Sequence, residues 1–376
     1  MFPPVRRDRT ICRRQPTNRE LVLKSVLRFV AQALAIVAIT LTLDFVLSAT
    51  LFSGLKKSWA EAARPGVYMP APHHHDLVPD REITRVWGAV RYPWKTDKFG
   101  FRTGTCAPGE PQEGRAAIFV VGDSFTEALG STYEQSFAGL MACDAARQGK
   151  AVYNLGVASY SPAIYHRKIR AAAERLGLKP AEIFVFLDLS DIDDDANVYH
   201  ASSDIAAGHA SPVGWKIPWA EIGGFFLNNF ATVHFVHDLV VASSFNQRMS
   251  FGRARARWTF DPVLLDSWGR RGLEIAGGNL DEVVALCRQW HCRVTLVVYP
   301  WPDNVAAGDR DSLQVRHWRD WAEARDVRFV DGFAPFFREP ARAAIGKYYI
   351  PGDVHFTEAG NRLLFDEVKK AIDETW

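Results

Sequence analysis

The sequence predicts an α/β protein, a three-layer α/β/α sandwich with about five parallel strands, preceded by one N-terminal transmembrane helix. From residue 116 onward, short apolar runs alternate with segments of helical character. This alternation is the pattern of βαβ units, which bury a parallel sheet between two layers of helices. Before that point, prolines interrupt the chain, and an unbroken apolar run extends from residue 29 to residue 52.

Residues 1–28 form a basic cytoplasmic tail with eight Lys/Arg against two acidic residues, a formal charge of +6. Because the whole chain carries +2, the remainder carries +2 minus +6, or −4. A mildly acidic body lacks the basic face that nucleic acid requires, so the sequence argues against a nucleic-acid partner. The tail instead orients the apolar segment that follows.

Residues 29–52 are long enough to cross a hydrocarbon core of about 30 Å. Asp44 is the charge within them, and it costs roughly 2.5–3.5 kcal/mol on insertion. The basic tail outweighs Lys56 and Lys57 on the other side. The positive-inside rule therefore predicts a single-pass signal anchor in the inner (cytoplasmic) membrane, with residues 53–376 in the periplasm or outside the cell.

A cleaved signal peptide is the alternative, with Ala60-Glu61-Ala62 as a small-x-small site, but that site lies too far beyond the apolar run. Both interpretations export the rest of the chain. Its cysteines permit one or two disulfides in an oxidising compartment, and free buried thiols are the alternative. They are Cys106, Cys143, Cys287 and Cys292, of which the last two are close enough in sequence to bridge a helix end to the next strand.

Residues 53–115 are interpreted as a stalk and an irregular segment that leads into the domain, because repeated prolines break up regular elements. Residues 95–104, KTDKFGFRTG, are typical of a hairpin or turn. Consecutive histidines do not converge on one ion in a strand or helix, so no metal site is predicted in the triplet His73, His74 and His75.

Residues 116–376 form the main domain. Five apolar runs are its predicted strands, which fit a flavodoxin-like sandwich; they cover residues 117–121, 151–157, 182–190, 293–300 and 327–333. Helices are predicted between them, among others over 133–148 and 162–176, the latter opened by a proline.

A long aromatic-rich insertion at about 195–265 separates the third strand from the fourth. Insertions of this length are usually functional, so we expect a lid or substrate wall, with membrane contact through its aromatic face as the alternative. His234 and His237 are one helical turn apart, but without a third ligand they predict no metal site.

Ser124 directly follows the first predicted strand in the sequence GDSFTE. In α/β folds ligands bind outside the carboxyl ends of the strands. A serine hydroxyl needs a base, and the base needs a group that orients it. The sequence PGDVHFTEAGN near the C-terminus supplies both, with Asp353 placed to accept from one nitrogen of His355 while the other faces Ser124.

Acyl transfer also requires donors for the oxyanion of the tetrahedral intermediate. The second strand ends in NLGVASYSP, where Gly156 allows close approach and offers its N–H. The third strand ends in LSDIDDD, which places Ser190 or Asp191 at the equivalent height.

These four blocks resemble the SGNH/GDSL hydrolases across roughly residues 116–370. The resemblance implies that Ser124 is the nucleophile, that Asp353 and His355 complete the triad, and that the N–H groups of Ser124 and Gly156 form the oxyanion hole. The family's third donor is an asparagine side chain where this sequence has Ser190, which adds a hydroxyl of shorter reach. We expect Asp123, Asn154 and Asp191 to support these residues.

The Asp-x-His spacing has one intervening residue where the family more often has two. This spacing and the predicted anchor are similar to an exported branch that moves acetyl groups on polysaccharides. The consensus GxSxG of α/β-hydrolases is absent. As alternatives, Ser124 or Asp353 would merely cap a helix, and the acidic run Asp191, Asp193, Asp194 and Asp195 is predicted to be a solvated helix start rather than a cation site.

The sequence therefore predicts a membrane-tethered, exported serine esterase that cleaves small acyl esters without a metal or cofactor. An acyltransferase acting on an extracellular glycan is the alternative from another enzyme class, and a non-catalytic glycan-binding protein is the third. The aromatic insertion favours an acylated carbohydrate as the substrate, since aromatic faces suit sugar rings.

Overall fold

The computed structural model describes residues 18–51, 66–87, 90–112, 114–199, 229–233, 235–236 and 254–373. They belong to two compact units, the first with residues 1–59 and 220–235 and the second with residues 60–219 and 236–376. Several predictions lie outside the described residues, namely those on most of the basic tail, on Ala60-Glu61-Ala62, on His234 and His237, and on most of the insertion.

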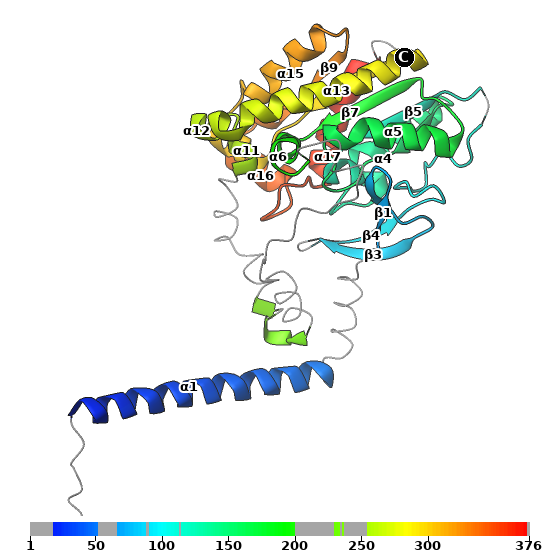
Figure 1. The fold of residues 1–376 in the computed structure, drawn as a ribbon. Coiled ribbons are helices and arrows are strands. Elements are labelled where there is room, and N and C mark those ends of the chain that lie inside the picture. Colours follow the sequence, from blue (N-terminus) through cyan, green and yellow to red (C-terminus); the bar gives the residue numbers. More distant parts are fainter. Residues whose placement is uncertain are drawn as a thin grey trace, which may run out of the picture. The chain divides into compact units, whose positions relative to one another are not determined.

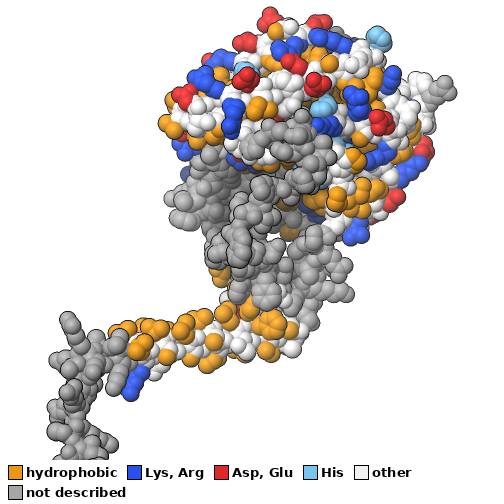
Figure 2. All heavy atoms as spheres, viewed as in Figure 1, with side chains coloured by type: hydrophobic (Ala, Val, Ile, Leu, Met, Phe, Trp, Pro, Cys, Tyr) orange, Lys and Arg blue, Asp and Glu red, His pale blue; other side chains and the backbone are white. Residues whose placement is uncertain are grey.

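The first unit is built on helix α1 (Asn18–Ala49). Its stretch Val26–Ala49 is long and apolar enough to cross a membrane, and nearly all of that stretch is exposed. Figure 2 shows a surface of mostly hydrophobic side chains along this helix. The predicted apolar helix is thus present, although it begins before residue 29 and ends at Ala49.

The second unit is organised around a parallel sheet of five strands in the order β6-β5-β7-β8-β9 (Figure 1). The strands are β5 (Ala117–Val121), β6 (Ala151–Asn154), β7 (Glu182–Leu187), β8 (Arg293–Val298) and β9 (Arg328–Asp331). The residues of β5, β6 and β7 are all buried, as expected for a sheet covered on both faces. All five predicted strands are confirmed, and four of the predicted runs extend past the carboxyl end of their strand.

Two layers of helices cover the sheet. α4 (Phe137–Arg147) and α17 (Glu358–Asp373) pack together on one face. α5 (Pro162–Leu176) and α13 (Arg270–Trp290) pack together on the other, where α15 (Leu313–Glu323) places Trp321 against Gly277 of α13. Among the described residues, the other helical elements of this unit are α3 (Ser124–Glu127), η1 (Tyr133–Gln135), α6 (Leu189–Asn197), α11 (Ala254–Arg257), α12 (Pro262–Leu264), η2 (Leu265–Gly269), α14 (Pro302–Ala307), η3 (Ala334–Phe337) and α16 (Ala341–Tyr348).

The segment before the sheet is more regular than predicted. It contains two antiparallel hairpins, β1 (Tyr68–Ala71) with β2 (His74–Leu77), and β3 (Glu82–Trp87) with β4 (Val90–Lys95). Prolines at 70 and 93 are tolerated because each hairpin has only two strands, so both strands are edges. The turn predicted at 95–104 is present, with a bridge between Thr96 and Arg102.

Two disulfides join the four cysteines that follow α1 in the sequence, Cys106 to Cys143 and Cys287 to Cys292. The first ties the segment before the sheet to α4, and the second joins the end of α13 to the start of β8. The interpretation with two disulfides is therefore confirmed. Disulfides persist in oxidising compartments, which fits an exported domain.

We expect the Cys106–Cys143 bond to stabilise the domain, because it closes a loop of 37 residues in the unfolded chain. The paired variant C106A/C143A should lower the free energy of unfolding by about 3–4 kcal/mol, as loop-closure entropy predicts. Urea unfolding followed by circular dichroism measures this loss. The variant C287A/C292A is the control, since its loop spans only 5 residues and should cost less. Equal losses for the two variants would contradict the expectation.

Candidate active site

The turn from β5 into α3 presents Ser124. Gly122 is required there, since a Cβ at this position would lie 2.2 Å from Thr126 Oγ1 and 2.8 Å from the Phe186 carbonyl oxygen. Asp123 then caps α3 by accepting from the Phe125 N–H at 3.0 Å. Ser124 is consequently the first helical residue, and its side chain is half-buried at the carboxyl end of the sheet.

Three predicted residues meet at this point. Ser124 Oγ lies 2.9 Å from His355 Nε2, and His355 Nδ1 lies 2.5 Å from Asp353 Oδ1. The same Asp353 oxygen accepts from the His355 backbone N–H at 2.8 Å. The two-residue spacing thus places the carboxylate where it holds the imidazole by its Nδ1–H, which leaves Nε2 as an acceptor for the serine hydroxyl.

The structure contradicts the alternative in which Ser124 or Asp353 merely caps a helix. The cap of α3 is Asp123, not Ser124. At the start of α17 the Gly360 N–H donates to Thr357 Oγ1, while Asp353 binds His355. Ser124 and Asp353 are therefore available for chemistry.

The imidazole of His355 lies between two aromatic rings. Phe125 is tilted against it with ring centroids 4.6 Å apart, and Trp87 meets it edge-on at 5.2 Å. The Trp87 Nε1–H also donates to Asp353 Oδ2 at 3.1 Å. Burial raises the pKa of Asp353, but the hydrogen bonds from His355 and Trp87 outweigh it and lower the pKa to about 2. The carboxylate is therefore ionised at neutral pH.

Two of the three predicted oxyanion donors are engaged elsewhere. The Gly156 N–H donates to Asn154 Oδ1 at 2.9 Å, and the Ser190 hydroxyl donates to Asp188 Oδ2 at 2.6 Å. A glycine is needed at 156 for packing, since a Cβ there would lie 2.6 Å from Thr126 of α3. Within the part of the chain that the structure describes, the Ser124 N–H has no acceptor. Ser124 is thus the predicted donor that remains free.

The predicted supporting residues hold the elements around Ser124. Asn154 donates from Nδ2 to the Thr126 carbonyl at 2.7 Å, so it ties β6 to α3. Asp123 Oδ2 lies 3.1 Å from Ser124 Oγ. The serine hydroxyl has one hydrogen and donates to either Asp123 or His355 at a time. Asp191 accepts from the Tyr165 hydroxyl at 2.6 Å and from the Asp188 N–H at 3.0 Å.

Asp123, Asp188 and Asp191 form a buried group with ligand atoms within 4.8 Å of one another. Burial and the neighbouring Asp188 raise the pKa of Asp123 well above its usual value, and burial and Asp123 do the same for Asp191. Asp188 Oδ1 accepts from Trp301 Nε1 at 2.5 Å, so an indole N–H holds one member of this group.

The acidic run does begin a helix, as predicted, but the prediction that it is solvated is wrong. The run lies within α6, and Asp191, Asp194 and Asp195 are buried. Arg255 of α11 pairs with Asp193 and Asp194 at 3.0 and 2.5 Å. The sequence did not reveal this burial because the partner, Arg255, is about 60 residues away in the chain.

Glu127 and Trp87 are functional candidates that the sequence interpretation missed. Glu127 ends α3, is fully buried, and accepts from Arg85 Nη1 at 2.8 Å and from the Ala158 N–H at 2.8 Å. Ser159, next to Ala158, has φ 63°, a left-handed conformation that is uncommon outside glycine. The motif GDSFTE contains Glu127, but no residue near it in the sequence indicates that Arg85 and Ala158 are its partners.

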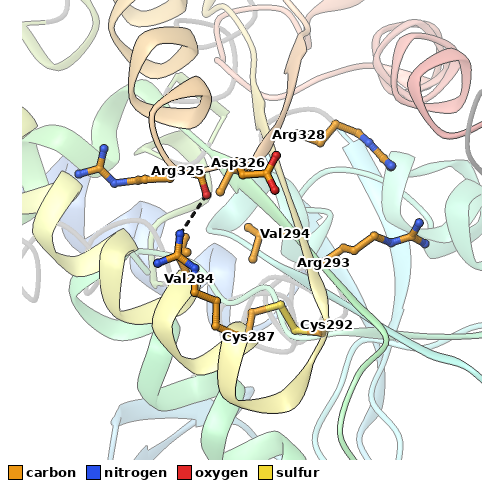
Figure 3. Close-up of a pocket in the computed structure, with 10 residues that line it drawn as sticks. Val284, Cys287, Cys292, Arg293, Val294, Arg325, Asp326 and Arg328 are labelled. Atoms are coloured by element: carbon orange, nitrogen blue, oxygen red, sulfur yellow. Dashed lines mark hydrogen bonds between the residues drawn. A yellow bond between two sulfur atoms is a disulfide. The ribbon is translucent and has the colours of Figure 1, made fainter.

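A pocket of about 480 Å³ lies at the opposite end of the sheet, where β8 and β9 begin (Figure 3). Its arginines are largely neutralised: Arg293 and Arg328 pair with Glu182, and Arg325 pairs with Asp281. Ser124 is not among its lining residues. We assign no part of the reaction to it.

The family model for GDSL-like lipases and acylhydrolases matches residues 120–363. The chain belongs to this family. It is therefore an ester-hydrolysing enzyme, an acylhydrolase of the GDSL type, and the motif that names the family contains Ser124. A search of curated proteins found no match.

A search of solved structures found similar chains, two of which are esterases. The psychrotrophic esterase EstA from Pseudoalteromonas sp. is 12% identical, with a TM-score of 0.39, and the match covers 69% of this chain and 97% of that one. The acetylxylan esterase Axe2 from Geobacillus stearothermophilus, solved as a catalytic mutant, is 15% identical, with a TM-score of 0.38 and coverage of 70% and 96%. The family assignment rests on the family model.

We expect Asp195 to make the acylhydrolase less stable as the pH rises. Burial raises its pKa to about 6, despite the hydrogen bonds from Ser161 and Asn279. The unfolded value is about 3.9, so the folded state binds more protons between about pH 4 and 6 and its stability falls over that window. Between about pH 4 and 6, the free energy of unfolding should therefore fall by about 2–3 kcal/mol less in D195N than in the wild type.

Urea unfolding at pH 4, 5, 6 and 7 measures the effect, and the exposed D311N is the control. Identical pH dependence in wild type and D195N would contradict the expectation.

Proposed function

We propose that this acylhydrolase is a membrane-tethered, exported serine esterase with Ser124, His355 and Asp353 as its catalytic triad. The observation that carries the proposal is the continuous hydrogen-bond path from Asp353 through His355 to Ser124, at 2.5 and 2.9 Å. These side chains come from opposite ends of the matched family region, and helix capping accounts for neither Ser124 nor Asp353.

In the first half-reaction, His355 Nε2 takes the Ser124 proton while Oγ attacks the acyl carbonyl carbon. Asp353 holds the imidazole in the required tautomer and stabilises the imidazolium. The Ser124 N–H donates to the oxyanion, and His355 then returns the proton to the leaving alcohol. In the second half-reaction, water attacks the acyl-enzyme by the same path and releases the acid.

Three features support an exported, anchored enzyme. The apolar stretch Val26–Ala49 follows a basic tail, both disulfides suit an oxidising compartment, and the triad belongs to the part of the chain that follows the anchor. We place the N-terminus in the cytoplasm and the enzyme domain in the periplasm or outside the cell.

We propose small acyl groups, such as acetyl, on an extracellular carbohydrate as the substrate. The support is the Asp-x-His spacing together with the anchor, which resemble the polysaccharide-modifying branch of the family. An acyltransferase shares the first half-reaction and differs only in the acceptor that attacks the acyl-enzyme.

Replacing Ser124 by Ala should lower kcat/KM for p-nitrophenyl acetate by about 10⁶-fold, and Asp353→Ala should lower it by about 10⁴-fold, the pattern of a triad that acts as a unit. A fluorophosphonate probe should label the wild type and not Ser124→Ala. Ser267→Ala is the matched control, because its hydroxyl is exposed and donates only to the Leu264 carbonyl.

Equal ester turnover and equal labelling in wild type and Ser124→Ala would overturn the proposal. Acetyl transfer to an added oligosaccharide that exceeds acetate release would assign the chain to the transferases instead.

A further inference from the structure

Trp87 contacts both acid-base members of the proposed triad. Its Nε1–H donates to Asp353 Oδ2 at 3.1 Å, and its ring meets His355 edge-on, with centroids 5.2 Å apart and planes at 88°. The matched family region begins at residue 120, so this side chain reaches the site from outside it.

The two oxygens of Asp353 have separate partners. Oδ1 accepts both hydrogen bonds from His355, and Oδ2 accepts from Trp87. Asp353 lies in a turn and its side chain is 24% exposed, so the surrounding core does not fix it. A carboxylate held at one oxygen can still rotate about its side-chain bonds, whereas one held at both keeps a single orientation.

The hairpin that carries Trp87 is itself tied to the nucleophile. Arg85 lies two residues earlier in β3 and therefore on the same face of the strand. Its guanidinium pairs with Glu127 at 2.8 Å, at the end of the helix that Ser124 begins. The face of β3 that carries Arg85 and Trp87 thus contacts two parts of the site. Arg85 pairs with Glu127 of α3, and Trp87 contacts Asp353 and His355.

On the basis of the proposed function, we propose that Trp87 is a positioning residue of the esterase. Its N–H fixes the orientation of Asp353, and its ring covers one side of the His355–Asp353 pair. Trp87 acts through Asp353 and His355 and takes no proton itself. Its removal should therefore slow the chemical step and leave substrate binding nearly unchanged.

The variant W87F keeps an aromatic ring against His355 and loses the donor. A hydrogen bond to a charged group is stronger than one between neutral groups, so kcat for p-nitrophenyl acetate should fall about ten-fold or more, with KM within about two-fold. W87H offers a ring N–H and should recover part of the loss. W290F is the control for removal of an indole, because Trp290 lies at the end of α13.

Activities are normalised to the folded fraction measured by circular dichroism, so partial unfolding does not imitate the effect. A kcat of W87F within two-fold of wild type, with Ser124→Ala inactive, would overturn the role of Trp87 and leave the esterase intact. Equal turnover by wild type and Ser124→Ala would overturn the esterase itself.

A second inference concerns Asp44 and rests on separate observations in the first unit. Asp44 and Ser48 lie one turn apart on α1, and both are buried although the helix around them is exposed. Asp44 accepts from the Thr232 N–H at 3.2 and 3.3 Å to its two oxygens, and Ser48 Oγ accepts from the Ala231 N–H at 2.8 Å. Phe230 packs against Phe45 with ring centroids 5.8 Å apart.

A polar group in hydrocarbon needs a partner inside the protein. Here the carboxylate and the hydroxyl of the anchor accept from backbone N–H groups of the insertion. Phe235, three residues beyond Thr232, is 68% exposed and so free to contact lipid. We infer that residues 229–233 and 235 dock on the anchor within the membrane, with Asp44 as their polar contact.

Cysteine cross-linking in native membranes tests this docking. In a Cys12→Ser background, S48C/A231C should form an intramolecular disulfide on mild oxidation, detected by mass spectrometry of the joined peptides. V46C/A231C should not, because Val46 lies on the other side of α1 and is 48% exposed. Adding D44L should reduce the S48C/A231C yield several-fold. Equal yields for the two pairs, or no cross-link in either, would overturn the inference.

Discussion

The buried carboxylate of Glu127 is the interaction on which the arrangement around Ser124 depends. It lies at the end of α3 and accepts from Arg85, Tyr68 and Trp94 of the hairpins and from the backbone of Ala158 after β6. A buried charge is tolerated only when it is fully paired, and removal of one partner from such a pair costs about 3–5 kcal/mol. The helix that begins with the nucleophile is therefore fixed at its far end by segments that precede and follow it in the chain.

The surroundings of Ser124 also contain more carboxyl groups than the proposed ester hydrolysis uses. Asp353 is exposed enough, and well enough bonded, to remain ionised, whereas burial raises the pKa of Asp123. The two lie on either side of the Ser124–His355 pair. Their environments therefore shift the pKa values of the two carboxyls in opposite directions, downward for Asp353 and upward for Asp123. A second full negative charge beside Ser124 would oppose formation of the oxyanion.

The sheet, the helices α4 and α5 and the meeting of Ser124 with His355 could be predicted, because apolar periodicity and short motifs are local signals. The hairpins could not, since prolines at 70 and 93 argue for irregular chain and only the pairing of two edge strands accommodates them. Trp87 was missed because its partner is 266 residues away. The burial of Asp194 and Asp195 was missed for the same reason. The motif that placed Gly156 beside the site did not reveal that Asn154 engages its N–H.

The distance in sequence between Trp87 and Asp353 also has a consequence for biogenesis. In the proposed topology, the hairpin crosses the membrane early and residues 353–355 cross it late. Long-range contacts of this kind form late in folding, because the entropy of closing the loop must be paid first. In the proposed esterase, the group of Ser124, His355 and Asp353 would remain incomplete until nearly the whole domain had crossed the membrane and folded. A partly translocated chain would then hydrolyse no ester near the membrane.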